Sequence, residues 1–144
     1  RTVGIAAPMA TTIADIAAAR RDYLDESGGR YVHVIADGSV STTGDLVKAI
    51  ACGADAVMLG TALARAAEAP GSGWHWGQEA HHASLPRGER VRVETAGTLE
   101  EILHGPSREA AGRVNFMGAL RHAMAANGYT DIKEFQRAEL VIAD

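Results

Sequence analysis

Residues 31–61 decide the fold, and they read YVHVIADGSVSTTGDLVKAIACGADAVMLGT. Residues 31–36 and residues 56–59 are short apolar runs, and a glycine turn follows each of them. Such runs are typical of strands that are covered on both faces of a parallel sheet. Between them, residues 43–52 carry apolar side chains at helical spacing. Strand, helix and strand in this order predict a βαβ unit with two parallel strands.

Local signals set the ends of this helix and predict further ones. Thr42 and Asp45 have the spacing by which a hydroxyl and a carboxylate satisfy the free N–H groups of a helix start, and Gly53 can close the helix in a left-handed conformation. Thr12 and Asp15 repeat the start pattern, so a second helix is predicted over residues 12–25.

The remaining chain divides into two parts. A short helix is expected over 62–68, and the Pro-Gly-rich break after it opens a flap from about residue 70 to 97, in which residues 90–94 alternate like a half-exposed strand. A helical tail follows from about 98 to 144. Its predicted helices follow a capping box at Thr98–Glu101, run through Val114–Met124 to a stop near Gly128, and lie over 131–136.

Composition and charge exclude several classes of protein. A formal net charge of -4 and an aromatic content of 5% argue against binding of nucleic acid, which calls for basic residues and stacking rings. No run approaches the 18 or so apolar residues of a membrane span. A single cysteine, Cys52, fits a reducing compartment, so we expect a cytoplasmic protein. The chain opens on Arg1 instead of methionine, and we expect its natural N-terminus to lie upstream.

The candidate site lies where the two predicted strands end, at Asp37-Gly38-Ser39 and Gly60-Thr61. Ligands bind at the carboxyl ends of parallel strands, and the loops after strands seven and eight of (β/α)8 barrels often hold a phosphate. Glycine lets backbone N–H groups approach phosphate oxygens, nearby helix N-termini favour the negative charge, and Ser39 and Thr61 add hydroxyl donors. The two turns therefore predict a phosphate site.

Asp37 has two interpretations. A carboxylate at the end of an apolar strand is costly to desolvate unless it is paired, and two sugar hydroxyls would satisfy it. Alternatively, Asp37 caps the next helix or closes a turn, since Asp-Gly is a common turn dipeptide.

Residues 33–38, 44–54 and 57–61 resemble the seventh and eighth barrel strands of inosine-5'-monophosphate dehydrogenases in sequence, order and spacing. The glycine-rich helix from Gly112 to Gly128 and the stretch from Glu134 to Val141 also resemble the C-terminal tail of that family. With its Trp-His-Trp-Gly flap, the chain is most similar to a dehydrogenase-related bacterial branch. The resemblance implies an α/β fold, with residues 1–144 forming the C-terminal part of a (β/α)8 TIM barrel, an incomplete barrel whose strand-seven and strand-eight region spans about 30–69.

The resemblance also implies a function. Asp37 would bind the ribose hydroxyls, and the backbones of Gly38-Ser39 and Gly60-Thr61 would bind the 5'-phosphate of a purine nucleoside monophosphate. The parent enzyme would be a homotetramer that oxidises inosine 5'-monophosphate to xanthosine 5'-monophosphate with NAD, near a monovalent cation such as potassium. Ser39 stands where the dehydrogenases usually have a second glycine.

The resemblance does not assign all catalytic groups to residues of this chain. The nucleophilic cysteine of the family would lie just upstream of Arg1, and Cys52 is expected to be a buried small hydrophobe instead. In the flap, Trp76-Gly77-Gln78-Glu79 is the counterpart of the family's Arg-Gly-Met-Gly run, with tryptophan in place of the arginine that activates water. Either another flap residue such as Arg87 takes that role, or hydrolysis is altered or absent.

Two further functions stay open at this point. One is a reductase that acts on guanosine monophosphate with NADPH, and the other is a purine-nucleotide-binding protein that has lost turnover. No metal site is predicted, because the flap histidines His75, His81 and His82 have neither helical ligand spacing nor a cysteine or carboxylate partner.

Overall fold

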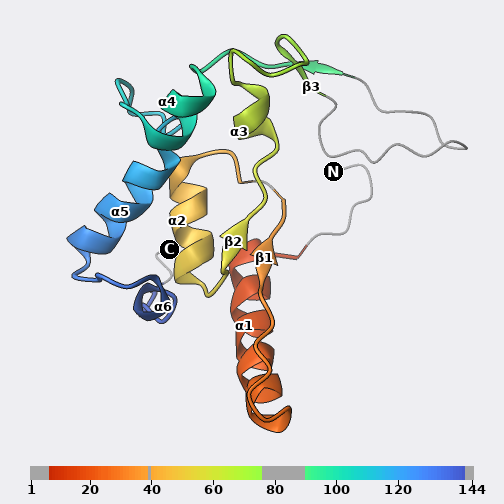
Figure 1. Ribbon diagram of the computed structural model, residues 1–144, viewed down its shortest axis with the longest axis vertical. Helices are drawn as coiled ribbons and strands as arrows, with labels where there is room; N and C mark the ends of the chain where they lie inside the picture. Colours follow the sequence, from red (N-terminus) through yellow and green to blue (C-terminus); the bar gives the residue numbers. More distant parts are fainter. Residues whose placement is uncertain (1–6, 39, 76–89, 142–144) are drawn as a thin grey trace, which may run out of the picture.

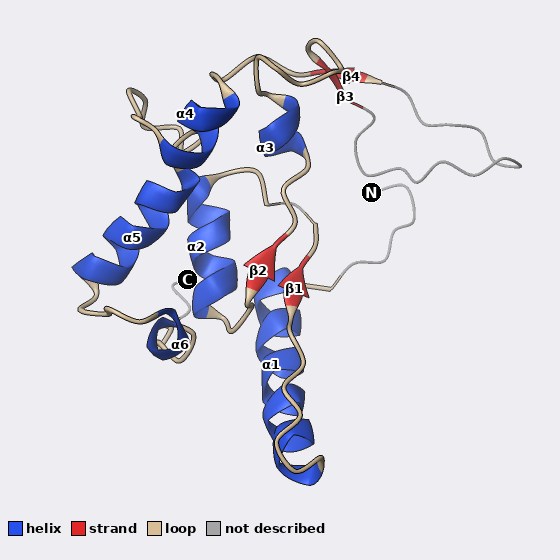
Figure 2. Ribbon diagram, in the orientation of Figure 1, coloured by secondary structure: helices blue, strands red, loops and turns tan. Residues whose placement is uncertain are grey.

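The computed structural model describes residues 7–38, 40–75 and 90–141. Its centre is the predicted βαβ unit, in which β1 (Ile35–Ala36) and β2 (Ala56–Val57) run parallel and α2 (Thr43–Ala51) connects them. Ile35 pairs with Ala56 and Ala36 with Val57. The two strands lie side by side in Figure 1 and form the only strand pair near α2 in Figure 2, within the described ranges.

The sheet is more open than the sequence predicts. Val34 and Ala36 are buried, but Ile35 is 57% exposed and Met58, just after β2, is 52% exposed. Among the described residues, the expectation that both faces are covered is therefore wrong: their helices cover one face only. Each strand is also shorter than predicted, because in the described part of the chain it has a single neighbour with which to form a ladder.

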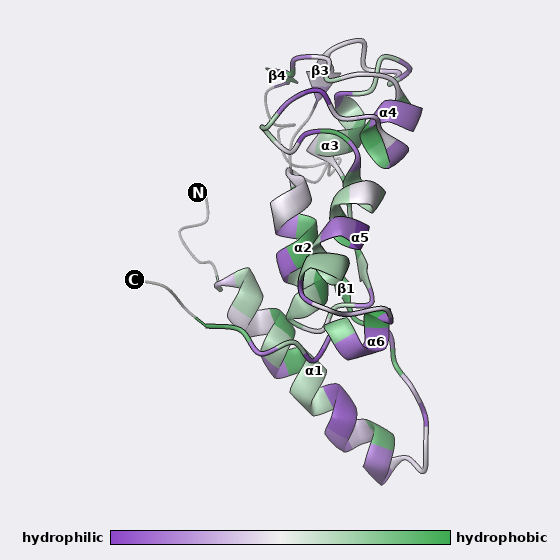
Figure 3. Cartoon of the chain, turned by 90° about the vertical axis from the view of Figure 1, so that its left-hand side faces the viewer, coloured by the Kyte–Doolittle hydropathy of each residue, from purple (hydrophilic) through white to green (hydrophobic). Residues whose placement is uncertain are grey.

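The predicted first helix begins earlier than expected, since α1 spans Met9–Glu26. The Thr12 hydroxyl does not cap the helix but donates back to the Pro8 carbonyl at 3.0 Å. Ile13 and Ala17 are buried, while Ile16 is 48% exposed. Figure 3 shows that the end of α1 that extends past the other helices is largely hydrophilic.

The start and stop signals of α2 are confirmed. The Thr42 side chain accepts a hydrogen bond from the Asp45 N–H, and the Asp45 carboxylate accepts one from the Thr42 N–H. Gly53 has a φ of 113°, the left-handed conformation that glycine adopts without strain. This helix ends where its local sequence indicates.

The flap region contains a short hairpin. After α3 (Thr61–Ala64), which is shorter than predicted, β3 (Trp74–His75) pairs antiparallel with β4 (Val91–Arg92). Both residues of β4 are exposed. Residues 76–89 lie outside the described ranges.

The tail forms three helices, α4 (Leu99–His104), α5 (Phe116–Ala126) and α6 (Ile132–Phe135). The capping box of Thr98 and Glu101 is confirmed. The start of α5 is two residues later than the apolar pattern predicts, because Asn115 adopts a left-handed φ of 60° and its side chain accepts the Gly118 N–H. No helix of the described residues has both the length and the apolar character to cross a bilayer.

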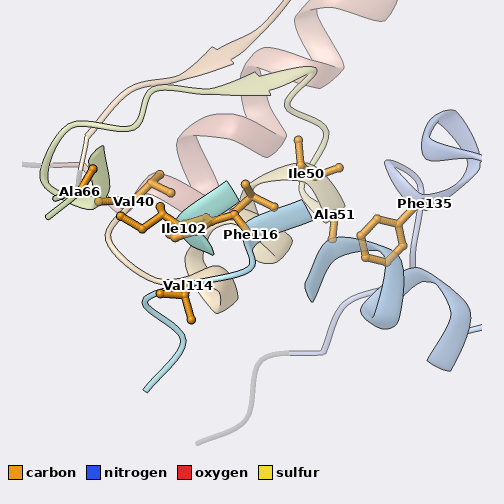
Figure 4. Packing of buried hydrophobic residues seen from close by; sticks show 10 residues of the cluster. Val40, Ile50, Ala51, Ala66, Ile102, Val114, Phe116 and Phe135 are labelled. Carbon is orange, nitrogen blue, oxygen red and sulfur yellow. The ribbon is translucent and has the colours of Figure 1, made fainter. Parts of the chain in front are cut away.

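The main core joins α2 to the tail. In Figure 1, α2 lies between α5 and β2, and α6 lies near its C-terminal end. Figure 4 shows Ile102, Val114 and Phe116 near Val40 at one end of the cluster, with Phe135 near Ala51 at the other. The tail is thus part of the same core as the βαβ unit.

Candidate functional site

The parallel pairing of β1 and β2 brings the predicted site turns to one edge of the sheet. The Met58 N–H donates to the Ala36 carbonyl at 2.8 Å, one residue beyond the ladder. Asp37 and Gly38 follow directly on β1, and Gly60 and Thr61 follow closely on β2. Because the strands are parallel and in register, both turns lie at their carboxyl ends.

Asp37 does not cap the next helix, since Thr42 is the N-cap of α2. The Asp37 side chain is exposed. It forms no hydrogen bond or ion pair with another residue in the described ranges. The carboxylate therefore retains its capacity to accept hydrogen bonds from a ligand.

The two site glycines differ in backbone conformation and in the space around them. Gly38 has a φ of 119°, and a Cβ there would lie 3.3 Å from the Met9 methyl group. Both conformation and space therefore favour glycine. Gly60 has a φ of -100°, which any residue adopts, and a Cβ there would meet nothing within 4 Å. Its missing side chain leaves the backbone open to a ligand. Ser39 lies outside the described residues.

The two neighbouring helix starts are not equivalent. At α2, the Asp45 carboxylate accepts the Thr42 N–H at 3.1 Å, and the Gly112 carbonyl accepts the Thr43 N–H at 2.7 Å. This start is therefore closed by the protein itself. The start of α3 has Gly60 as its N-cap and no side-chain cap.

The charge of Asp45 is well stabilised. Partial burial raises the pKa of this carboxyl, but hydrogen bonds from Thr42 and the nearby Lys48 ammonium outweigh burial, and the pKa lies below its ordinary value. Asp45 is therefore a fixed anion at the start of α2, where it stabilises the helix and competes with any other anion.

Cys52 occupies the position expected of a structural residue. It is the C-cap of α2 and is partly buried. Burial raises the pKa of its thiol, with Lys48 acting in the opposite direction. A thiol that resists ionisation is a poor nucleophile, so Cys52 does not replace the cysteine expected upstream.

The flap candidates Trp76, Gly77, Gln78 and Arg87 lie outside the described residues. Trp74 is described, and the Arg90 guanidinium lies 5.4 Å from its ring centroid. Together with Leu63, Pro70 and Leu99, the indole lines an apolar groove beside α3. Among the described residues, no three or more His, Cys, Asp or Glu side chains gather closely enough to hold a metal ion.

Sequence reasoning missed a cluster of polar side chains, which surrounds Asp55 at the amino end of β2. The Asp55 side chain is only 8% exposed. Its carboxylate accepts hydrogen bonds from five groups: Arg20 at 2.5 Å, the Tyr31 hydroxyl at 2.5 Å, Lys133 at 2.6 Å, the Val34 N–H at 2.8 Å and Gln136 at 3.1 Å. Burial raises the pKa of Asp55, but these hydrogen bonds, first of all that from Lys133, hold it far below its ordinary value.

The only local signal for this cluster is an acidic residue immediately before an apolar strand. Its partners are far away in sequence, and Lys133 is 78 residues from Asp55. The cluster lies at the opposite end of the strands from Asp37, on the side where polar residues of parallel α/β folds contribute to stability.

Comparison with known proteins identifies relatives along most of the chain. Residues 1–82 match the IMP dehydrogenase / GMP reductase domain. An uncharacterized oxidoreductase of Mycolicibacterium smegmatis is 58% identical over 142 residues, covering 97% of this chain and 38% of the relative. Inosine-5'-monophosphate dehydrogenase of Aquifex aeolicus is 31% identical over 159 residues, covering 92% of this chain and 29% of the relative.

A solved structure is also similar. The crystal structure of an IMP dehydrogenase/GMP reductase-like protein from Corynebacterium glutamicum superposes with a TM-score of 0.90 at 57% identity, covering 98% of this chain and 38% of the other. The chain thus spans between 29% and 38% of the length of these relatives.

Proposed function

Since the chain belongs to the IMP dehydrogenase / GMP reductase family, we propose that it forms the phosphate- and ribose-binding corner of an oxidoreductase that converts inosine 5'-monophosphate to xanthosine 5'-monophosphate with NAD. The relatives named as oxidoreductases support the class of reaction. The observation that carries the proposal is the pairing of an exposed Asp37 carboxylate with the open Gly60-Thr61 turn at neighbouring strand ends.

In this proposal, the Asp37 carboxylate accepts hydrogen bonds from two ribose hydroxyls. Such charge-assisted hydrogen bonds are stronger than neutral ones and orient the sugar. The backbone N–H groups of Gly38-Ser39 and Gly60-Thr61, with the two hydroxyls, hold the 5'-phosphate. The phosphate would lie nearer the uncapped start of α3 than the closed start of α2.

We further propose that the described sheet is part of a (β/α)8 barrel. Parallel sheets are normally covered on both faces. The exposed side chains of Ile35 and Met58 lie on the face that a barrel interior would cover, next to strands that have one neighbour each among the described residues. A barrel needs about 200 residues or more, so the remaining strands would come from the rest of the protein.

The chemical step would use groups outside this chain. A cysteine thiolate from the part of the protein outside this chain would add to C2 of the purine, and NAD would supply the acceptor for the hydride lost from C2. Water would then displace the cysteine, so that inosine monophosphate, NAD and water would give xanthosine monophosphate, NADH and a proton. The residues described here hold and orient the nucleotide, and none is assigned to NAD. The potassium ion, the homotetramer and the cytoplasmic location remain predictions.

The test is a substrate assay on the whole purified protein. With inosine monophosphate and NAD, we expect NADH to form, measured by its absorbance. Oxidation of NADPH in the presence of guanosine monophosphate would instead identify a reductase, which the family description also covers. If a purine monophosphate binds in a titration but neither assay shows turnover, the protein is a nucleotide-binding protein without this activity.

A further inference from the structure

We propose that the tail positions the Asp37–Gly38 turn by holding α2 at both ends, with Gly112 as the positioning residue at the end nearer the site. This inference rests on the proposed function, because it assigns a role toward the nucleotide. It concerns how the binding turn is kept in place, and the groups involved do not themselves touch the ligand.

The first contact holds the start of α2. The Thr43 N–H donates to the Gly112 carbonyl at 2.7 Å, across 69 residues of sequence (112 − 43). Gly112 has a φ of 68°, and a Cβ there would lie 2.8 Å from the Thr43 hydroxyl oxygen and 3.6 Å from the Thr43 nitrogen. Only glycine allows the tail backbone to come this close to the helix.

A short connection links this contact to the proposed site. Val40, which follows the site turn, is 4% exposed and belongs to the core cluster that contains tail residues. The Ser41 and Thr42 N–H groups both donate to the Asp45 carboxylate, at 3.4 Å and 3.1 Å. Thr43 is only five residues after Gly38, so the α2 start and the site turn are close in sequence as well as joined through the packing of Val40.

The second contact holds the other end of α2. Gln136 donates to the Ala54 carbonyl at 2.6 Å, and Lys133 pairs with Asp55 at 2.6 Å. A Cβ at Gly53 would lie 2.6 Å from the Ala17 methyl group and 4.0 Å from the Gln136 carbonyl, so α1 and the tail enclose this turn from two sides.

Between the two contacts the tail packs along the helix. α5 lies against α2 in Figure 1, and Phe116 and Phe135 belong to the same cluster as Leu46 and Ile50. Packed elements of this kind move as a unit and transmit small displacements. The position of α2, and with it the turn after β1, therefore depends on the tail.

The experiment removes the Thr43–Gly112 hydrogen bond without removing the helix. Thr43 is the first residue of α2, where proline is tolerated, and Thr42 has the extended backbone that a following proline requires, with φ -127° and ψ 162°. Thr43→Pro in the whole protein deletes the donor N–H. Thr43→Ala is the matched control, since it loses the side chain and keeps the N–H.

Dissociation constants for inosine monophosphate are measured by titration. We expect Thr43→Pro to raise the constant about tenfold and Thr43→Ala to change it less than about twofold, because small misplacements of binding groups are costly. Gly112→Ala should act like Thr43→Pro, whereas Gly128→Ala, at a similar φ of 78° with nothing within 4 Å, should act like the control. Unchanged affinity in folded Thr43→Pro would overturn the inference.

A second readout separates this inference from the proposed function. Amide hydrogen exchange over residues 41–46 should be faster in Thr43→Pro than in Thr43→Ala, whether or not nucleotide binds. If the wild-type protein binds no purine monophosphate, the proposed function fails, and with it the site role of Gly112. If it binds and exchange is equal in the two variants, the tail does not hold this helix start.

Discussion

The two ends of the β1–β2 pair each carry an aspartate, and the two aspartates differ in burial and in hydrogen bonding. Asp55, at the amino end, is enclosed by two cations, a tyrosine, a glutamine and a backbone N–H. Asp37, at the carboxyl end, is exposed and has no partner among the described residues. At the amino end, groups of the fold itself donate hydrogen bonds to the carboxylate. At the carboxyl end, the carboxylate can still accept hydrogen bonds from a ligand. Under the proposed function, stability and binding are thereby separated along one pair of strands.

Removing Asp55 should have the largest effect. Asp55→Ala leaves Arg20, itself only 10% exposed in its side chain, and Lys133 without their common partner. We expect the free energy of unfolding to fall by about 3 kcal/mol, as when one member of a buried ion pair is removed. Urea denaturation measures this, with Asp22→Ala on exposed α1 as a control that should change it by less than about 0.5 kcal/mol. Equal midpoints for both variants would mean that the cluster does not stabilise the fold.

Removing Asp37 should affect binding and spare stability. Two charge-assisted hydrogen bonds to ribose would be lost, so we expect Asp37→Ala to weaken binding of inosine monophosphate about a hundredfold, which is about 2.7 kcal/mol. The free energy of unfolding should stay within about 0.5 kcal/mol of wild type, because the side chain is exposed. Titration and denaturation of the same preparation test both parts. A stability loss like that of Asp55→Ala would erase the contrast between the two ends.

The pH dependence of stability should report on the amino end. The pKa of Asp55 is depressed in the folded state, so its contribution is present above its unfolded pKa of about 3.9 and is lost as pH falls through the still lower folded pKa. The gap in unfolding free energy between wild type and Asp55→Asn should therefore be full at neutral pH and narrow in strong acid. Denaturation series at several pH values measure the gap, and a gap independent of pH contradicts the assignment.

Substitution of the two site glycines should have the smallest effects on stability and affinity. Gly38→Ala introduces left-handed strain of about 1–2 kcal/mol and crowds Met9, so it should lower both stability and affinity. Gly60→Ala meets open space and an ordinary backbone, so only affinity should fall. Parallel titration and denaturation distinguish the two variants. A stability loss at Gly60 would show that its turn is tighter than described.

Features that depend on interactions between residues close in sequence were the easiest to predict. Thr42, Asp45 and Gly53 act within one helix, and their pattern predicted both ends of α2. Thr12 misled because its hydroxyl had a second acceptor, the Pro8 carbonyl four residues back. The sequence alone predicted that the site turns Asp37-Gly38 and Gly60-Thr61 lie at one edge of the sheet, because parallel strands impose that arrangement.

What the sequence did not reveal depends on long-range pairing. Lys133 is 78 residues from Asp55, and nothing around either residue indicates the other. The contact between Gly112 and Thr43 uses a backbone carbonyl, which every residue has, so only the three-dimensional approach singles it out. Exposure of Ile35 was missed because an apolar strand is the same in sequence whether or not a neighbour covers it.

The open sheet has a consequence for handling the chain by itself. An edge strand with unpaired backbone groups, next to exposed apolar side chains such as Ile35 and Met58, is a template for another copy of the same strand. Produced alone, these 144 residues should associate edge to edge and precipitate as concentration rises. If the proposed barrel is right, co-expression with the rest of the protein should keep this chain in solution.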